Sequence, residues 1–355
     1  PFLLFRNDFK IKLVEADKLP DRMVFIPGGQ YKLASRTRPT EVRVELDAYF
    51  IDKYEVTNRE FKEFVSVGGY FKPEFWKHLF VKDGRTLSFD EAMKEFRDRT
   101  GLPGPRSWSG QNFPEGKAEH PVTDITWHEA AAYAAFRGKQ LPSVFQWEKA
   151  ARNGLFIYNS GYALPWGAME FGGTVVGHAN FNGSGTLPVN SFPFGASPFG
   201  CYQMAGNVSE WVEDVYRPLT STTLRDVENQ DLNPFRGNEF KELILDESGN
   251  PVEKDSLGSL RYQVVSDSAV NDRENYNKGE VKDFMDDDDE AVEYNYGKTS
   301  LVSKKSRVVK GGSWSDRLFW LSPGARRFKD EDKSDRSIGF RCAMTRTGGP
   351  EGNHD

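Results

Sequence analysis

Two short, glycine-bearing apolar segments near the C-terminus constrain the fold more than any other part of the chain. Residues 307–314 read Arg-Val-Val-Lys-Gly-Gly-Ser-Trp, and residues 337–343 read Ser-Ile-Gly-Phe-Arg-Cys-Ala. Short apolar runs are typical of buried strands, and glycine lets neighbouring backbones approach closely. We therefore predict two buried strands with an irregular, charged loop between them.

The composition favours a mixed fold with many loops. Of 355 residues, 33 are Gly and 19 are Pro, and 14% are aromatic, which suits short strands and long ordered loops better than a helical bundle. The formal net charge of -6 argues against nucleic-acid binding, since phosphate recognition needs a concentrated basic surface. No apolar segment approaches the roughly 20 residues that cross a bilayer. The two cysteines, Cys201 and Cys342, are either buried thiols or one disulfide.

The N-terminal third is predicted to be rich in hairpins. Residues 23–33 read as strand, turn and strand, because the Pro-Gly-Gly sequence at 27–29 supplies turn geometry. Between 42 and 46, valine and leucine alternate with charged side chains. This period of two predicts a half-exposed strand.

Helices are predicted from their N-terminal caps. Thr57–Glu60 and Thr126–Glu129 have capping-box spacing, and Ser143 is a candidate cap for a third helix. A shorter helix is predicted from Ser88 to Arg99. It lies in a polar stretch from Val81 to Glu119, which we interpret as an insertion beside the core.

Six further motifs follow in order along the chain. They are Ile51–Asn58, Pro121–Trp127, Gly138–Pro142, Trp147–Arg152, Pro165–Gly167 and Gly200–Trp211. With the C-terminal segments, they resemble the formylglycine-generating enzyme, or sulfatase-modifying factor, domain. The resemblance implies an α+β protein with that family's irregular variant of the C-type lectin-like fold and long loops. We expect an N-terminal arm at 1–22, a single domain at 23–348 with insertions at about 81–119 and 217–304, and a C-terminal tail at 349–355.

The same resemblance bears on catalysis. The family's two catalytic cysteines lie in the loop between the C-terminal strands, where this chain has Asp316 and Leu321. Neither side chain forms a thiolate or ligates copper. From this we predict that the chain is not an enzyme. For Asp316 the expected role is a structural salt bridge with Arg326 or Arg327.

A calcium site is implied by the resemblance of residues 206–211, Gly-Asn-Val-Ser-Glu-Trp, to a family calcium site. One Ca2+ would take the Glu210 carboxylate, the Gly206 and Val208 carbonyls and the side-chain oxygen of Gln203, all hard oxygen ligands. The alternative is that Glu210 satisfies buried backbone donors beside the tryptophan.

Other candidate sites are weaker. The five histidines show no zinc-like spacing, and we expect His128 to be a packed or capping residue. The acidic run Asp286–Glu290 lacks the spacing of an EF-hand loop. It is either a solvated face or a calcium-responsive surface.

Within the family, the segment Ser322–Phe328 and several Asn- and Tyr-rich stretches between 233 and 297 resemble gliding-motility lipoproteins associated with type IX secretion. We therefore expect a non-catalytic scaffold that is a structural or protein-binding component of that apparatus. It would be periplasmic, associated with the outer membrane through a lipid anchor outside this chain, with protein partners and no nucleic acid. The 81–119 insertion is similar to modules attached to bacterial serine/threonine kinases, so a ligand-sensing module is one alternative. A cysteine-independent metalloenzyme is the other.

Overall fold

The computed structural model describes residues 19–32, 43–82, 85–152, 163–168, 177–216, 232–233, 241–250, 252, 262–264 and 305–345. The acidic run Asp286–Glu290, most of the predicted N-terminal arm and the C-terminal tail lie outside these residues. Among the described residues, no helix is long and apolar enough to cross a membrane.

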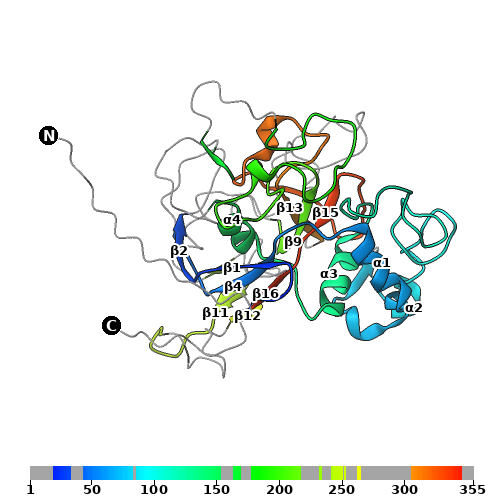
Figure 1. The fold of residues 1–355 in the computed structure, drawn as a ribbon. Coiled ribbons are helices and arrows are strands. Elements are labelled where there is room, and N and C mark those ends of the chain that lie inside the picture. Colours follow the sequence, from blue (N-terminus) through cyan, green and yellow to red (C-terminus); the bar gives the residue numbers. More distant parts are fainter. Residues whose placement is uncertain are drawn as a thin grey trace, which may run out of the picture.

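A four-stranded sheet lies at the centre of the molecule (Figure 1). Its strand order is β14 (Arg327–Asp330), β13 (Ser306–Lys310), β9 (Ser209–Val215) and β15 (Ile338–Phe340). β13 is antiparallel to both neighbours, whereas β15 runs parallel to β9. Every residue of β13 and β15 is buried. The two predicted C-terminal strands are therefore confirmed, but the stretch between them also contains β14, which the prediction of an irregular loop missed.

A second sheet is formed by segments from both ends of the chain. β4 (Tyr49–Asp52) lies between β1 (Met23–Ile26) and β16 (Ala343–Thr345), and both pairings are antiparallel. β2 (Gly29–Lys32) pairs with β3 (Arg43–Leu46) instead of with β1. The two strands predicted at 23–33 are therefore confirmed, but they do not pair with each other as a hairpin. Residues 27–28 redirect the chain toward β3 and β4, and a Cβ on Gly28 would lie 3.1 Å from the Ala48 nitrogen.

The remaining strands form small two- and three-stranded sheets. They are β5 (Phe80–Lys82) with β6 (Arg85–Leu87), β7 (Ala163–Leu164) with β8 (Gly167–Ala168), and β10 (Leu232–Asn233), β11 (Lys241–Leu243) and β12 (Tyr262–Val264). Short 3-10 helices occur at η2 (Gly69–Phe71), η3 (Pro73–Phe75), η4 (Pro193–Gly195) and η6 (Leu318–Leu321).

The predicted helix starts are confirmed. The helices are α1 (Asn58–Ser66), α2 (Phe89–Ala92), α3 (Trp127–Phe136) and α4 (Val144–Arg152). Thr57, Ser88 and Thr126 each close a capping box, and the Ser143 hydroxyl accepts the Gln146 N–H. The predicted helix at 88–99 is shorter than expected. It ends after one turn, where the chain turns to bury Met93 and Phe96.

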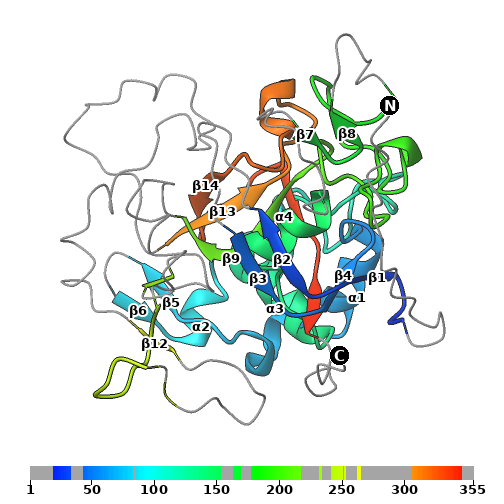
Figure 2. The ribbon, with the colours of Figure 1, turned by 90° about the vertical axis from the view of Figure 1, so that its left-hand side faces the viewer.

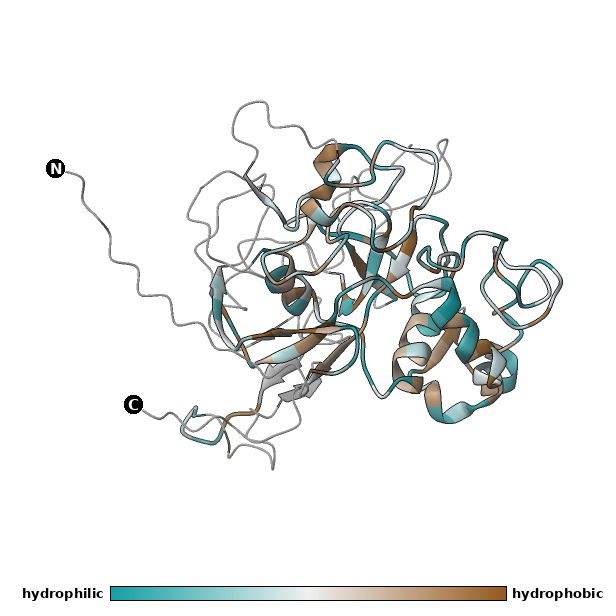
Figure 3. Cartoon of the chain, viewed as in Figure 1, coloured by the Kyte–Doolittle hydropathy of each residue, from teal (hydrophilic) through white to brown (hydrophobic). Residues whose placement is uncertain are grey.

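The core has two main parts, one on each side of the central sheet. In the first, α1, α3 and β15 meet through aromatic rings, with Phe61 stacked 5.4 Å from Tyr133. The insertion contributes Met93, Phe96 and Trp108 to this part, so it extends the core. In the second, α4 packs against β1–β4 and β9, and Figures 2 and 3 show it beside β2 and the apolar strands of the second sheet.

Candidate functional site

A fully buried ion pair joins β9 to the end of β15. The Arg341 Nε and Nη2 atoms lie 2.6 and 2.7 Å from the two carboxylate oxygens of Glu210, and both residues are 0% exposed. Trp147 Nε1 donates a third hydrogen bond to Glu210 at 2.7 Å. Burial lowers the pKa of Arg341, but the Glu210 carboxylate more than offsets this, so that the net shift is upward. Arg341 also donates to the backbone carbonyls of Asp52, Lys53 and Tyr202.

A second buried carboxylate, Glu55, lies next to this pair. It accepts hydrogen bonds from Asn207 Nδ2 at 2.7 Å and from the Val208 N–H at 3.2 Å. Burial, and then the charge of Glu210, raise its pKa well above the ordinary value. Sequence reasoning missed Glu55 and Arg341 as site residues. The sequence feature that could have identified them is a charged residue within a motif that also contains apolar residues, at 51–58 for Glu55 and at 337–343 for Arg341.

The predicted calcium ligands lie around this cluster. The Gln203 Oε1 atom is buried and has no hydrogen-bond partner among the described residues, while its Nε2 donates to the Ser191 carbonyl at 3.0 Å. A buried, unpartnered oxygen suits a hard cation. The two Glu210 oxygens accept three hydrogen bonds in this structure. Calcium and its predicted ligands Gln203, Gly206, Val208 and Glu210 stay predictions.

Asp316 orders the loop between β13 and β14. Its Oδ2 accepts from the Ser313 N–H at 2.8 Å and the Ser313 hydroxyl at 2.7 Å, and its Oδ1 accepts from Arg327 Nη1 at 2.6 Å. The predicted structural salt bridge is therefore confirmed, with Arg327 as the partner. Arg326 turns inward and binds Glu148 through Nε and Nη2 at 3.0 and 2.9 Å.

Leu321 lies on the inner side of the same loop. Its side chain is fully buried in a small cluster with Leu164, Ala179 and Ala205. The tight approach depends on Gly312, whose φ is +66° and whose Cβ, if present, would lie 2.9 Å from the Trp320 carbonyl. Leu321 therefore contributes packing to the loop.

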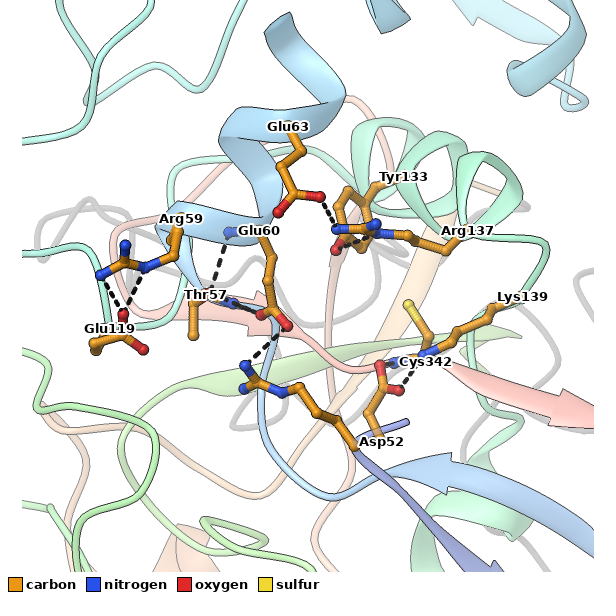
Figure 4. A network of polar contacts seen from close by, with 11 residues as sticks. Asp52, Thr57, Arg59, Glu60, Glu63, Glu119, Tyr133, Arg137, Lys139 and Cys342 are labelled. Atoms are coloured by element: carbon orange, nitrogen blue, oxygen red, sulfur yellow. Dashed lines mark hydrogen bonds and ion pairs between the residues drawn. The ribbon is translucent and has the colours of Figure 1, made fainter. Parts of the chain in front are cut away.

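Both cysteines are buried and free, so the reduced alternative holds in this structure. Burial raises the pKa of Cys201 to about 11. Burial, followed by the nearby Asp52 charge, raises the pKa of Cys342 well above its ordinary value. Figure 4 shows Asp52 between Lys139 and Cys342, accepting from Lys139 Nζ at 2.6 Å and the Cys342 N–H at 2.9 Å. Neither thiol is set up as a nucleophile at neutral pH.

His128 is a packed residue, as predicted. It is 5% exposed, its ring centroid lies 4.8 Å from that of Phe80, and its Nε2 lies 3.7 Å from a Glu331 oxygen. Nearby, the Arg307 guanidinium lies 3.9 Å from the centre of the Trp127 ring. Within the part of the chain that the structure describes, no group of three or more His, Cys, Asp or Glu side chains is arranged to hold a metal ion.

Comparison with known proteins identifies the family. The model described as "Sulfatase-modifying factor enzyme 1-like domain" matches residues 10–346. The chain belongs to this family. Among solved structures, PvdO from Pseudomonas aeruginosa has a TM-score of 0.50 at 18% identity, over 91% of this chain and 94% of that one. The predicted α+β fold of the formylglycine-generating-enzyme type is thus confirmed.

Three curated proteins that are similar to this chain have names that denote different activities. Serine/threonine-protein kinase pkn1 of Chlamydia caviae is 32% identical over 60% of this chain and 32% of the kinase. Hercynine oxygenase of Mycolicibacterium smegmatis is 30% identical over 56% of this chain and 47% of the oxygenase. Formylglycine-generating enzyme of Thermomonospora curvata is 32% identical over 58% of this chain and 76% of the enzyme. The match therefore spans about a third of the kinase and under half of the oxygenase.

These relatives overturn one prediction. The chain was predicted not to be an enzyme, but formylglycine-generating enzyme and hercynine oxygenase are enzymes by name and match more than half of it. The prediction rested only on the residues at positions 316 and 321. The absence of a thiolate there excludes catalysis by a cysteine at these positions, but it does not exclude other catalytic groups.

Proposed function

We propose that this family member is a protein-binding module whose binding surface includes the loop ordered by Asp316. Two arginine–tryptophan stacks on and beside this loop carry the proposal. The Arg327 guanidinium lies 4.6 Å from the Trp320 ring centre, and that of Arg336 lies 5.4 Å from the Trp314 ring centre. Aromatic residues and arginine are enriched in the cores of protein interfaces and at binding hot spots.

Rigidity supports the same proposal. Leu321 and the Asp316–Arg327 pair fix the loop, so a partner meets side chains that are already ordered. Phe319 on this loop is 40% exposed, and its ring centroid lies 5.0 Å from that of Trp320. We propose that Asp316 and Leu321 occupy the positions of the family's catalytic cysteines. In this chain, these two positions hold the loop in place through a carboxylate and a buried leucine.

Substitution of exposed residues on the proposed binding surface tests this proposal. Phe319→Ala and Arg336→Ala are each expected to weaken binding of the partner protein about tenfold or more, because they remove an exposed aromatic ring and a cation that contacts Trp314. Phe194→Ala is the matched control, since Phe194 is 78% exposed on η4. Equal binding by all three variants and the wild type would contradict the proposed surface.

The first setting we propose is a gliding-motility or type IX secretion apparatus at the outer membrane, with its protein components as partners. Its support is the resemblance of Ser322–Phe328 to that branch of the family. In this setting the intact protein is periplasmic and is held by a lipid anchor outside this chain. Labelling cells with radioactive palmitate should yield a labelled protein in the outer-membrane fraction together with secretion components. An unlabelled protein without such partners would argue against this setting.

The second setting is a ligand-sensing module joined to a serine/threonine kinase. The Chlamydia relative favours it, because the match covers only a third of that kinase. Here the intact polypeptide should be much longer than 355 residues and should incorporate phosphate from labelled ATP. An intact polypeptide without kinase activity would rule out the kinase setting.

We also propose one calcium ion bound near Gln203, Gly206 and Val208. The support is the Gln203 Oε1 atom, which has no partner in the described part of the chain, and the two buried carboxylates Glu55 and Glu210 near the Arg341 cation. A hard divalent cation would supply positive charge where carboxylates outnumber the arginine. Calcium should raise the melting temperature of the wild type but not that of Gln203→Leu. If the wild type has the same melting temperature with calcium and with a chelator, calcium does not bind at this site.

A further inference from the structure

A second ordered loop runs from Asp98 to Gln111, in a different part of the sequence from the loop around Asp316. It follows α2 within the 81–119 insertion, and Figure 1 shows it in cyan at the right-hand edge of the molecule. An exposed ion pair between Arg59 and Glu119, with N and O atoms 2.7 Å apart, joins the end of this insertion to α1 (Figure 4). The loop is thus presented at the periphery on a lobe that is attached to the core.

One carboxylate sets the shape of this loop. Asp98 Oδ1 accepts from the Thr100 N–H at 2.8 Å, the Thr100 hydroxyl at 2.7 Å and the Leu102 N–H at 3.1 Å. Its Oδ2 accepts from the Gln111 N–H at 2.7 Å. Burial raises the pKa of Asp98, but these hydrogen bonds outweigh burial and hold it below the ordinary value. The charged carboxylate therefore ties both ends of the loop together.

The core holds the base of the loop. Trp108 is 1% exposed, and its Nε1 donates to Asn58 Oδ1 at 3.1 Å. Lys62 Nζ on α1 donates to the Gln111 carbonyl at 2.7 Å, and Gln111 Nε2 donates to the Pro103 carbonyl at 3.0 Å. The conformational entropy of this loop is thus largely lost on folding, before any partner arrives.

The tip of the loop presents an apolar side chain with cations near it. Leu102 is 45% exposed, and Arg99 and Arg106 are both exposed. Burial raises the pKa of Asp124, a hydrogen bond from Ser107 opposes this, and the arginine charges lower the pKa further. The Arg106 N–H also donates to the Asp124 carbonyl at 3.0 Å. Leu102 therefore projects from a rigid loop whose exposed charges are positive.

We propose that this loop is a docking surface for a protein partner that has an apolar socket for Leu102 and an acidic rim for Arg99 and Arg106. The inference rests on the proposed protein-binding function and names a second face for it. Rigid presentation lowers the entropic cost of binding, and complementary charge sets orientation and association rate. An apolar anchor within a charged rim is the usual anatomy of a specific interface.

A protein fits this surface better than a lipid bilayer does. A single exposed leucine buries too little apolar area to hold a membrane, since stable anchoring needs an apolar helix face or lipid chains. The small apolar area therefore favours a protein partner over a membrane.

Photo-crosslinking identifies what touches the tip. A photoreactive phenylalanine derivative at position 102 is introduced into the full-length protein in its native cells, and the cross-linked species is identified by mass spectrometry. A cross-link to an acidic segment of one protein is the expected result. A cross-link to lipid or to nucleic acid, or no cross-link with any protein, overturns the inference.

Affinity measurements with the purified cross-linked partner complete the test. Leu102→Asp and the double variant Arg99→Glu/Arg106→Glu should each weaken binding at least tenfold, and the wild-type affinity should fall as salt rises. Leu79→Asp and Arg85→Glu are matched controls on the same lobe, since Leu79 is 73% exposed and the Arg85 side chain 65% exposed. Thermal unfolding of every variant checks folding.

The outcomes separate this inference from the proposed function. One outcome is that Leu102→Asp and the double arginine variant bind as tightly as the wild type, whereas Phe319→Ala binds more weakly. This outcome overturns the docking loop but not the proposed protein-binding function. A wild-type chain that forms no complex through either face overturns both.

Discussion

The loops around Asp316 and Asp98 are ordered in the same way, each by an aspartate, but a leucine on each loop lies in a different environment. In each loop, one aspartate accepts backbone and hydroxyl hydrogen bonds from residues two to four positions away along the chain. A leucine on each loop shows the difference between them. Leu321 is 0% exposed and fills a small core cluster, whereas Leu102 is 45% exposed at a tip.

The difference shows that order and burial are separate properties of a loop. A local carboxylate is enough to fix a backbone, because it satisfies N–H groups that would otherwise need water. How much the fixed loop adds to the stability of the fold depends on whether its apolar side chain is buried. The Asp316 loop is part of the domain's packing, and the Asp98 loop carries its leucine outward.

The largest predicted difference between the two loops is the effect of truncating Leu321 or Leu102 on stability. Leu321→Ala should cost about 2–5 kcal/mol of unfolding free energy, because it leaves a cavity beside Leu164 and Ala205. Leu102→Ala should change it by no more than about 0.5 kcal/mol. Urea unfolding measures both, and similar losses would contradict the contrast.

The charge of Asp98 acts on a buried tyrosine–glutamate pair, and the glutamate of this pair titrates near neutrality. Burial, then Glu129, then Asp98 raise the pKa of Tyr70, whose hydroxyl donates to Glu129 at 2.5 Å. Burial raises the pKa of Glu129 from 4.5 to about 7.

The sign of the pH effect follows from that shift. As pH rises from about 4.5 to about 7, the unfolded state loses the Glu129 proton before the folded state does. Stability should therefore fall by an amount on the order of 3 kcal/mol and level off above pH 7. The difference between the pH profiles of wild type and Glu129→Gln isolates this contribution. Parallel profiles would show that Glu129 ionises normally in the fold.

Removing the organising aspartate of the displayed loop should have a smaller effect. Asp98→Ala should cost about 2 kcal/mol, because three backbone N–H groups lose their acceptor. Asp98→Asn keeps one carbonyl oxygen and should cost less. Chemical denaturation ranks the two variants, and a neutral Asp98→Ala would mean that Trp108 alone holds the loop.

The smallest effect is expected at the other aspartate. Asp316 and Arg327 have side chains 11% and 15% exposed, so their coupling energy should be about 1 kcal/mol. A double-mutant cycle with Asp316→Ala and Arg327→Ala measures it. A coupling near zero would leave Leu321 as the main constraint on this loop.

Features encoded by neighbouring residues were predictable from the sequence. The caps at Thr57, Thr126 and Ser143 were found because a capping box needs only residues three positions apart. Features that depend on distant partners were not predictable in this way. The pairing of β1 with β4, and of β2 with β3, depends on which strands the core brings together.

The candidate site shows the same limit. Glu210 was found from its motif, but its partner Arg341 is 131 residues away along the chain, and Glu55 reaches Asn207 across 152 residues. The salt bridge of Asp316 was anticipated because Arg327 is only 11 residues away. The Asp98 loop lacked a periodic pattern, so its four hydrogen bonds became visible only in the structure.

Hydrogen exchange across residues 98–111, followed by mass spectrometry, tests the central claim most directly, namely that one aspartate holds a displayed loop rigid. In the free wild-type protein, the amides of Thr100, Leu102 and Gln111 should exchange slowly, because Asp98 accepts their hydrogens. In Asp98→Ala they should exchange much faster, while the amide of Ser313 should not change. Fast exchange of this loop in the wild type, or no difference between the two proteins, would contradict the claim.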